Sequence, residues 1–305
     1  MINININDVQ VMSVAEIISQ LRLERHRYVD EKFYPPEDTN REIQLGYFMT
    51  MVAIDHRTST PLGPFEGVID GEFYHGADLL YRLGKRVFDE DPTFFSAENL
   101  VNLDEMTGLR LFKIGDKKVW DYELRLFLLR DIGQKVIEYY DGEFRKLFEL
   151  NTITELINRL SIFRAYEDPV HKKIFLLAKF LDGRKLIRFK DPENFEVPVD
   201  NHISRIAIRL GIVTFSNYDV IKKQIELTRD EDIRVRLKIR ESWKEVSKKS
   251  GCDPFTLDDF LWSFGRTICL REKPKCNECA FRDVCLANRR REYWLEHRHI
   301  ITWYY

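Results

Sequence analysis

The sequence predicts a mainly α-helical protein. Apolar residues recur at helical spacing in several long segments, whereas the alternation typical of strands is confined to short stretches. Breaks that contain proline or glycine separate the helical segments. The expected helices cover residues 14–23, 76–88, 124–140, 153–164 and 217–228, the breaks fall at 35–36, 60–64, 91–92 and 141–142, and minor strands are expected at 2–6 and 185–189.

The composition limits the class of protein without naming a function. The 305 residues are 44% hydrophobic, which is enough for one large or two smaller cores. Because the formal charge is −2, a nucleic-acid surface would have to be a local basic patch. We find no apolar run of about 18 residues and no basic, apolar leader, so we expect a cytoplasmic protein without a membrane span. The many Lys and Glu residues suit a thermophile.

Residues 166–183 are expected to form a helix with a lysine near its start. Asp168 is a natural N-cap, Pro169 suits the first helical position, and Gly183 can adopt the left-handed conformation that ends a helix. Lys173 would then lie in the second turn, where the helix dipole and partial burial both favour a neutral amine. Only the neutral amine can attack a carbon atom. The alternative is that this Lys-Lys pair is simply solvated.

Another helix is expected in VPVDNHISRIAIRLG, residues 197–211. Asp200 can cap its start, Gly211 can end it, and isoleucines at helical spacing give it one apolar face. Capping alone would account for the aspartate, so the residues by themselves do not require a chemical role for it.

Four cysteines lie close together near the end of the chain, in GRTICLREKPKCNECAFRDVC. Cys269, Cys276, Cys279 and Cys285 have the spacing C-x6-C-x2-C-x5-C, and four thiolates suit zinc or an iron–sulfur cluster. The single tight C-x2-C pair disfavours a zinc ribbon, which has two. Two disulfides are the other alternative, but they would leave Cys252 over in a chain without signs of secretion.

These three segments resemble, in order, the helix–hairpin–helix DNA glycosylases of the endonuclease III type. VDNHISRIAIRLG resembles the family's VDTHxxRVxxR segment, and the cysteine spacing resembles its [4Fe–4S] loop. A weaker resemblance runs through residues 124–146. The resemblance implies that Lys173 is the nucleophile, that Asp200 is catalytic as well as a cap, and that the four cysteines bind a [4Fe–4S] cluster.

The resemblance also implies a two-lobed helical fold with DNA and the lysine at the cleft. We expect one helical-barrel lobe at residues 46–183. The second lobe would combine residues 1–45 with 184–305 and carry the aspartate and the cluster.

Two features depart from the endonuclease III pattern. The family's hairpin is glycine-rich and grips a DNA phosphate with backbone N–H groups, but the corresponding residues 167–171 contain no glycine and one proline. The segment KLIRFKDPENFEVPV between the two helices is also longer than usual. Both features resemble the archaeal 8-oxoguanine DNA glycosylases, which typically lack the iron–sulfur loop.

The function implied is base-excision repair of double-stranded DNA by a monomeric, nucleoid-associated prokaryotic enzyme. A damaged, oxidised base such as 8-oxoguanine would be flipped out, Lys173 would attack the sugar C1′ atom, and β-elimination from the Schiff base would nick the strand. Asp200 would accept or relay the lysine proton and stabilise positive charge on the sugar. Lys173 thus favours a combined glycosylase and AP lyase.

Two other functions remain open. One is a monofunctional glycosylase for deaminated or mismatched bases, which would need only the aspartate. The other is a non-catalytic iron–sulfur protein that binds DNA.

Further DNA contacts are expected at three places. His171 and Lys172 lie at the hairpin, and the cluster would hold the loop 270–275 rigid against phosphates. By resemblance to the family's early helix and turn, residues 51–67 would supply the side chain that fills the gap left by the flipped base. The alternatives are a solvated loop and residues that merely end a helix. The aromatic tail YWLEHRHIITWYY is expected to pack as core against the cluster domain, and stacking on bases is the alternative for it. The candidate contacts are His56, Arg57, His171, Lys172, Arg271, Lys273 and Lys275.

Overall fold

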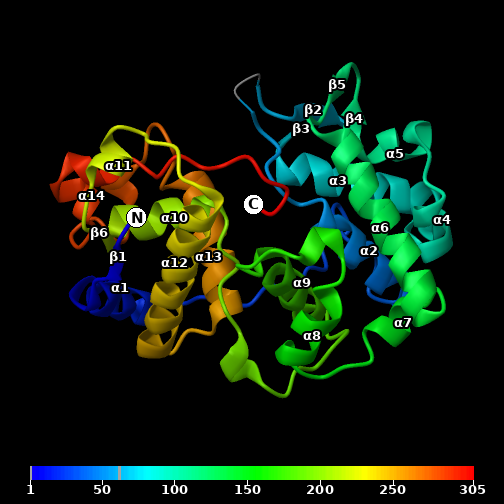
Figure 1. Ribbon diagram of the computed structural model, residues 1–305, viewed down its shortest axis with the longest axis horizontal. Helices are drawn as coiled ribbons and strands as arrows, with labels where there is room; N and C mark the ends of the chain where they lie inside the picture. Colours follow the sequence, from blue (N-terminus) through cyan, green and yellow to red (C-terminus); the bar gives the residue numbers. More distant parts are fainter. Residues whose placement is uncertain (1, 61–62) are drawn as a thin grey trace. The chain divides into compact units, whose positions relative to one another are not determined.

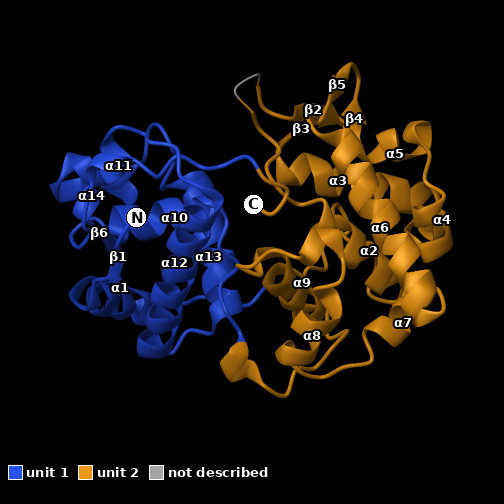
Figure 2. Cartoon of the chain, viewed as in Figure 1, with its two compact units in different colours: residues 1–26, 195–301 blue, residues 27–194, 302–305 orange. Residues whose placement is uncertain are grey.

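A computed structural model describes residues 2–60 and 63–305 (Figure 1). The chain forms two compact units: unit 1 contains residues 1–26 and 195–301, and unit 2 contains residues 27–194 and 302–305 (Figure 2). The first boundary thus lies near residue 26 rather than 45, and the second near 194 rather than 183. The break expected at 60–64 lies partly outside the described residues, at 61 and 62.

Unit 1 is mainly helical, with α1 packed along α12 and α10 packed against α13. Its strands β1 and β6 pair antiparallel, with Ile4 opposite Phe215. The buried side chain of Gln10 on α1 donates to the carbonyl oxygens of Leu210 and Val284, at 2.5 and 2.9 Å. The elements are β1 Ile4–Ile6, α1 Asp8–Gln20, α10 Asn201–Leu210, β6 Val213–Phe215, α11 Asp219–Lys222, α12 Arg229–Ser250, α13 Pro254–Thr267, α14 Leu286–Arg289 and the 3₁₀-helices Cys276–Glu278 and Arg291–Trp294.

Unit 2 is built around α2, which is buried along most of its length. Phe48 of α2 stacks on Phe180 of α9, and Ala53 at the end of α2 meets Lys173 at the start of α9, so the two helices run antiparallel. The helices are α2 Arg41–Ala53, α3 Ala77–Glu90, α4 Ala97–Val101, α5 Glu105–Phe112, α6 Tyr122–Tyr140, α7 Phe144–Leu147, α8 Ile153–Leu160 and α9 Lys172–Gly183. The remaining elements are β2 Glu66–Ile69, β3 Glu72–His75, β4 Lys113–Ile114, β5 Lys117–Lys118 and the 3₁₀-helices Pro92–Phe95, Arg164–Tyr166 and Pro192–Asn194.

The mainly helical class is confirmed, with some differences in detail. Residues 217–228 are helical only in α11, and 185–189 form no strand because the amides of residues 186 and 187 donate back to the carbonyl of Leu181. The first helix begins at Asp8, where the Asn7 side chain caps it, rather than at residue 14. Within the described residues, no helix is both long and apolar enough to cross a membrane.

Candidate active site

Helix α9 begins with two buried lysines and no side-chain cap. Its N-cap is His171, which has a φ of 57°, and its first residue is Lys172. The expectation that Asp168 caps the helix and Pro169 begins it is therefore wrong, because a separate turn occupies residues 168–171. Lys173 lies in the first turn, closer to the positive end of the helix dipole than predicted.

The end of α9 also differs from the prediction. Gly183 does not adopt the left-handed conformation; Lys185, two residues later, does, with a φ of 59°. The chain turns there because the amide of Leu186 donates to the carbonyl of Leu181.

The amine of Lys173 is fully buried between two acceptors. Its Nζ lies 2.5 Å from the carbonyl oxygen of Ala53, at the end of α2, and 3.2 Å from Nδ1 of His56. An ammonium group has three N–H donors, whereas a neutral amine has two and a lone pair. Two acceptors therefore satisfy the hydrogens of the neutral amine and leave its lone pair available.

The electrostatics of this site agree with a neutral amine. Burial lowers the pKa of Lys173 well below that of a free lysine, and the positive charges of Lys172 and Arg125 lower it further. Asp55 and Asp168 oppose this shift. A lysine with a lowered pKa has the protonation state that nucleophilic catalysis requires.

Behind the lysine lies a buried His–Asp–Arg triad, which we call triad A: His56, Asp121 and Arg125. His56 Nε2 is 2.7 Å from Asp121 Oδ2, and Arg125 Nε donates to Asp121 Oδ1 at 2.7 Å. Arg125 also donates to the carbonyl oxygens of Ile54 and Arg57. The carbonyls that α2 leaves unpaired at its end are thus bound by side chains from α6 and α9.

The turn before α9 is closed on itself by Asp168, which is fully buried. Its carboxylate accepts from the amides of Val170 and Lys172, both at 2.8 Å, and its carbonyl accepts from the amide of His171 at 2.9 Å. Pro169 has no N–H to donate. The amides that follow Pro169 therefore donate within the turn.

Residues 302–305 cover this turn. Tyr305 donates its hydroxyl to Asp168 Oδ1 at 2.9 Å, and its carbonyl accepts from the amide of Arg57 at 2.9 Å. Tyr304 reaches Glu167 at 3.2 Å. The aromatic tail was expected to pack against the cluster domain. Its residues up to 301 belong to unit 1, where Trp294 lines the pocket of the four cysteines, whereas residues 302–305 belong to unit 2 and lie beside the lysine helix.

Helix α10 of unit 1 begins with a conventional cap. The side chain of Asp200 accepts from the amide of Ile203 at 2.8 Å, and Gly211 ends the helix with a φ of 79°. Both boundaries are as predicted. Asp200 remains partly exposed.

A second buried triad, triad B, supports the start of α10. His297 Nε2 is 3.0 Å from Asp232 Oδ1, and Arg236 Nε donates to Asp232 Oδ2 at 2.8 Å. Arg236 then donates to Asn201 Oδ1 at 2.7 Å. Asn201 follows Asp200 directly, so triad B fixes the first residue of this helix.

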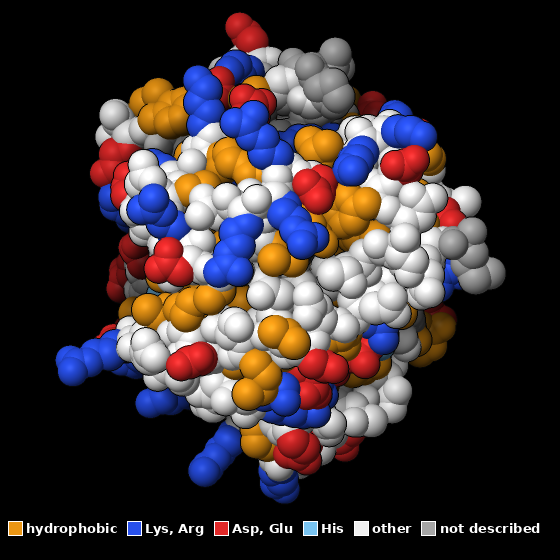
Figure 3. Space-filling model, turned by 90° about the vertical axis from the view of Figure 1, so that its left-hand side faces the viewer, with side chains coloured by type: hydrophobic (Ala, Val, Ile, Leu, Met, Phe, Trp, Pro, Cys, Tyr) orange, Lys and Arg blue, Asp and Glu red, His pale blue; other side chains and the backbone are white. Residues whose placement is uncertain are grey.

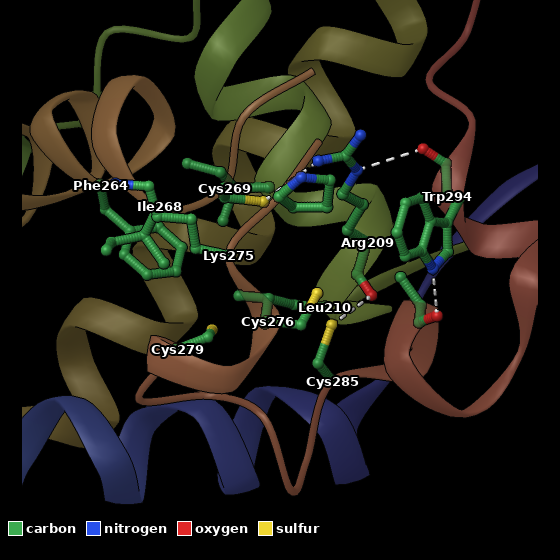
Figure 4. A pocket seen from close by; sticks show the side chains of 13 residues that line it. Arg209, Leu210, Phe264, Ile268, Cys269, Lys275, Cys276, Cys279, Cys285 and Trp294 are labelled. Atoms are coloured by element: carbon green, nitrogen blue, oxygen red, sulfur yellow. Dashed lines mark hydrogen bonds between the residues drawn. The ribbon is translucent and has the colours of Figure 1, made fainter. Parts of the chain in front are cut away.

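The four predicted cysteines line one pocket in unit 1, together with apolar residues of α10 and α13 (Figure 4). Arg209 of α10 donates to Cys269 Sγ at 3.4 Å, and the thiol of Cys285 donates to the Arg209 carbonyl at 3.3 Å. Arg209 also binds the carbonyls of Leu270 and Arg271, both at 2.6 Å. One arginine of the aspartate helix thus holds the cysteine loop in place.

The four cysteines give this pocket an all-sulfur donor set, which suits zinc or an iron–sulfur cluster. In residues 2–60 and 63–305, no three Cys, His, Asp or Glu side chains converge closely enough to hold one metal ion. A zinc site needs four sulfurs at about 2.3 Å from one atom.

Comparisons with known proteins relate this chain to N-glycosylases in sequence. The sequence model of the family AGOG, described as N-glycosylase/DNA lyase, matches residues 173–293, which is less than half of the chain. An endonuclease III homolog of Encephalitozoon cuniculi is 29% identical over 89 residues, which are 29% of this chain and 29% of that protein. A queuosine 5′-phosphate N-glycosylase/hydrolase of Dictyostelium discoideum is 21% identical over 225 residues, covering 65% of this chain and 68% of that protein. The chain thus spans under a third of the first relative and about two thirds of the second.

Two solved structures share the arrangement of helices. A trapped covalent intermediate of endonuclease III with DNA has a TM-score of 0.51 at 13% identity, covering 93% of this chain and 96% of that one. An 8-oxoguanosine complex of the 8-oxoguanine DNA glycosylase from Pyrobaculum aerophilum also has a TM-score of 0.51, at 16% identity, covering 91% and 96%. The chain resembles the helix–hairpin–helix DNA glycosylases in sequence and shares their fold. In this glycosylase fold, Lys173 lies in unit 2 and Asp200 in unit 1.

Two of the residues predicted to contact DNA, His56 and Lys172, are buried. His56 is only 3% exposed and is bound to Asp121, so it cannot fill a gap in a base stack from this position. Lys172 is 6% exposed and donates to the carbonyl of Asp55 at 2.8 Å, so it presents no charge to a phosphate. Arg57 and His171 are partly exposed.

The loop 270–275 carries exposed basic side chains, as expected. Arg271, Lys273 and Lys275 are exposed, and Arg271 pairs with Glu296 at 2.9 Å. On the face shown in Figure 3, Lys and Arg side chains are interspersed with Asp and Glu. Their contact with DNA stays a prediction.

The sequence analysis missed the members of triad A apart from His56, and it missed Tyr305. The pair Asp121 and Arg125 is visible as an i, i+4 ion pair in the sequence. The contact of Tyr305 with Asp168 spans 137 residues and has no local signal.

Proposed function

We propose that this protein is a DNA N-glycosylase with AP lyase activity, in which Lys173 is the nucleophile. The observation that carries the proposal is the buried amine of Lys173 with two acceptors for its two hydrogens. The fold and the family match support glycosylase chemistry. The proposed substrate is double-stranded DNA with a damaged base, oxidised as in 8-oxoguanine.

In the proposed reaction, the lone pair of Lys173 bonds to the sugar C1′ atom. The bond from C1′ to the base breaks, and its electron pair leaves with the base nitrogen, which takes up a proton. Ring opening gives a Schiff base, and β-elimination then expels the 3′ phosphate. Asp200 stabilises the positive charge that develops on the sugar.

We also propose that Cys269, Cys276, Cys279 and Cys285 ligate a [4Fe–4S] cluster. The shared pocket and its all-sulfur donors support this ligand set. The cluster would act as a structural anchor for the loop 270–275. Anaerobic purification followed by iron and sulfide analysis tests it: four of each per chain support the cluster, whereas zinc or no metal overturns it. As a control, Cys252→Ser should keep the metal content of the wild type, because Cys252 does not line the pocket of the four cysteines.

Borohydride trapping on labelled duplexes tests the main proposal. The duplexes contain 8-oxoguanine, thymine glycol, uracil, hypoxanthine or a plain abasic site. A covalent adduct with a lesion supports the glycosylase–lyase and identifies its base. Base release without an adduct would support a monofunctional glycosylase, and tight DNA binding without either would support the non-catalytic protein.

A second candidate is an N-glycosidase that acts on a free nucleotide. Asp168 already binds the amides of the turn that would grip a DNA phosphate, and Tyr304 and Tyr305 cover that turn. The Dictyostelium relative, named for a nucleotide 5′-phosphate, matches about two thirds of each chain. The acidic, covered turn favours a small substrate over a duplex at this position.

Chromatography of reactions with free 5′-nucleotides, including queuosine 5′-phosphate, separates the two candidates. Base release from a mononucleotide with all duplexes inert would favour the second candidate. Activity on lesion duplexes with all mononucleotides inert would exclude it.

A further inference from the structure

The hydrogen bonds of triad A determine which nitrogen of His56 carries a proton. Asp121 is bound by Arg125 and therefore acts as an acceptor toward His56 Nε2. The hydrogen of the neutral ring must then be on Nε2, which leaves Nδ1 as an acceptor. Nδ1 faces the Lys173 amine at 3.2 Å.

The charged groups around His56 come from several elements. Asp121 and Arg125 belong to the start of α6, and Lys172 and Lys173 to α9. Two further carboxylates act on Lys173: Asp168 in the turn before α9, and Asp55, which follows α2. Burial lowers the pKa of His56 well below its usual value, and Arg125, Lys173 and Lys172 lower it further. The ring is therefore neutral before the reaction and has an open site for a proton.

We propose that His56 is a positioning residue that orients the Lys173 amine and takes up the proton this amine loses on bonding to the sugar. Asp121 and Arg125 hold His56 in the required tautomer. The inference rests on the proposed function, since it needs Lys173 to attack C1′, but it holds for either substrate. It assigns to His56 the proton transfer that the family resemblance implied for Asp200.

The step is balanced. The nitrogen of Lys173 forms a bond to the carbon and becomes positively charged, and one of its hydrogens passes to His56 Nδ1. The imidazolium that results is stabilised by Asp121, 2.7 Å from its other nitrogen. At an abasic aldehyde the electron pair of the C=O bond moves to oxygen. This oxygen takes up the proton held by His56 and the second amine hydrogen, and it leaves as water when the Schiff base forms.

The variant His56→Asn tests the proposal. Asparagine can accept a hydrogen bond from Lys173 but cannot take up a proton. We measure single-turnover borohydride trapping against pH with the full chain, using an abasic duplex and, for the second candidate, ribose 5-phosphate. In the wild type both the lysine and the histidine must be deprotonated, so log rate should rise from acid pH with a slope of about two.

His56→Asn should trap roughly 10²–10⁴-fold more slowly at neutral pH, with a slope of about one. His297→Asn, the matching change in triad B, should keep the wild-type rate and slope. An unchanged rate and slope in folded His56→Asn would overturn the proposal. A wild type that traps neither probe would instead overturn the proposed function.

A measurement on the wild type avoids any problem of folding in the variant. Nitrogen-15 NMR of histidine-labelled protein reports the tautomer of each ring. A neutral His56 with its proton on Nε2 supports the proposal. A protonated ring, or a proton on Nδ1, overturns it because Nδ1 could not then accept from Lys173.

Discussion

Triad A in unit 2 and triad B in unit 1 have the same construction. Each joins a histidine to an aspartate, and the aspartate to an arginine four residues later. They differ in what the histidine Nδ1 faces: that of His56 meets the Lys173 amine, whereas that of His297 is buried without a hydrogen-bond partner among the described atoms. The same buried His–Asp–Arg arrangement thus occurs in both units, and only triad A places its histidine against the proposed nucleophile.

The helix starts that the triads support differ in the same way. Helix α10 begins with Asp200, a cap that suits the helix dipole. Helix α9 begins with two lysines, which the dipole disfavours, and it is held by tertiary contacts to the end of α2. A local rule is obeyed at the first start and broken at the second, as is common where a site needs an unusual protonation state.

The contrast between triad A and triad B depends most strongly on Lys173 being the reactive group. We expect Lys173→Gln to abolish borohydride trapping while DNA affinity stays nearly unchanged, because the amide cannot form a Schiff base. Lys179→Gln is the matched control, since Lys179 is a third buried lysine of the same helix. Undiminished trapping by Lys173→Gln would remove the lysine from the mechanism.

The role of Asp200 can be separated from its role as a cap. Asparagine caps helices as well as aspartate does, so Asp200→Asn should keep the stability and lower the reaction rate by roughly 10²–10³-fold through the lost charge stabilisation. Asp200→Ala should lose the same activity and about 1 kcal/mol of stability. The measurements are single-turnover kinetics and urea unfolding. Full activity in Asp200→Asn would show that the residue is a cap and nothing more.

Removing the central carboxylate sharpens the contrast between the triads. Asp121→Ala and Asp232→Ala each leave a buried arginine without its ion pair, so each should cost about 3–5 kcal/mol in urea unfolding. Only Asp121→Ala should also change the pH profile of trapping, because only triad A contacts the lysine. A changed profile in Asp232→Ala would mean that the two triads are functionally equivalent.

The buried lysine should also leave a signature in stability. Because the pKa of folded Lys173 lies below the unfolded value of about 10.4, the unfolded chain binds more protons between the two values. The stability of the wild type relative to Lys173→Met should therefore rise with pH in that window, by about 1.4 kcal/mol per unit. Below the folded pKa the difference should be constant. Urea unfolding at several pH values measures it, and a flat difference across the window would mean an unshifted lysine.

The start of α10 could be predicted from the sequence, whereas the start of α9 could not. The cap at Asp200 and the ending at Gly211 depend on residues a few positions away, which a local pattern contains. Asp168 also resembles a cap, but it closes a separate turn and binds Tyr305, which is 137 residues away. In the sequence, an aspartate that caps a helix looks the same as one that closes a separate turn. Only the distant contact with Tyr305 distinguishes the two.

The same limit applies to the triads and the cysteines. The Asp–Arg spacing is local, but each histidine comes from 65 residues away, before Asp121 in triad A and after Asp232 in triad B. His56 was therefore predicted as an exposed DNA contact when it is part of the core. The cysteines were predicted to converge on one site, and they line one pocket.

The turn around Asp168 has a consequence for how binding would respond to salt. A protein that neutralises a DNA phosphate releases condensed counterions, and each such contact contributes about −0.9 to the slope of log affinity against log salt concentration. This turn supplies its own anion, since Asp168 takes the amide hydrogens that a phosphate would take. It therefore adds nothing to that slope. Any dependence of DNA binding on salt should therefore come from other parts of the chain.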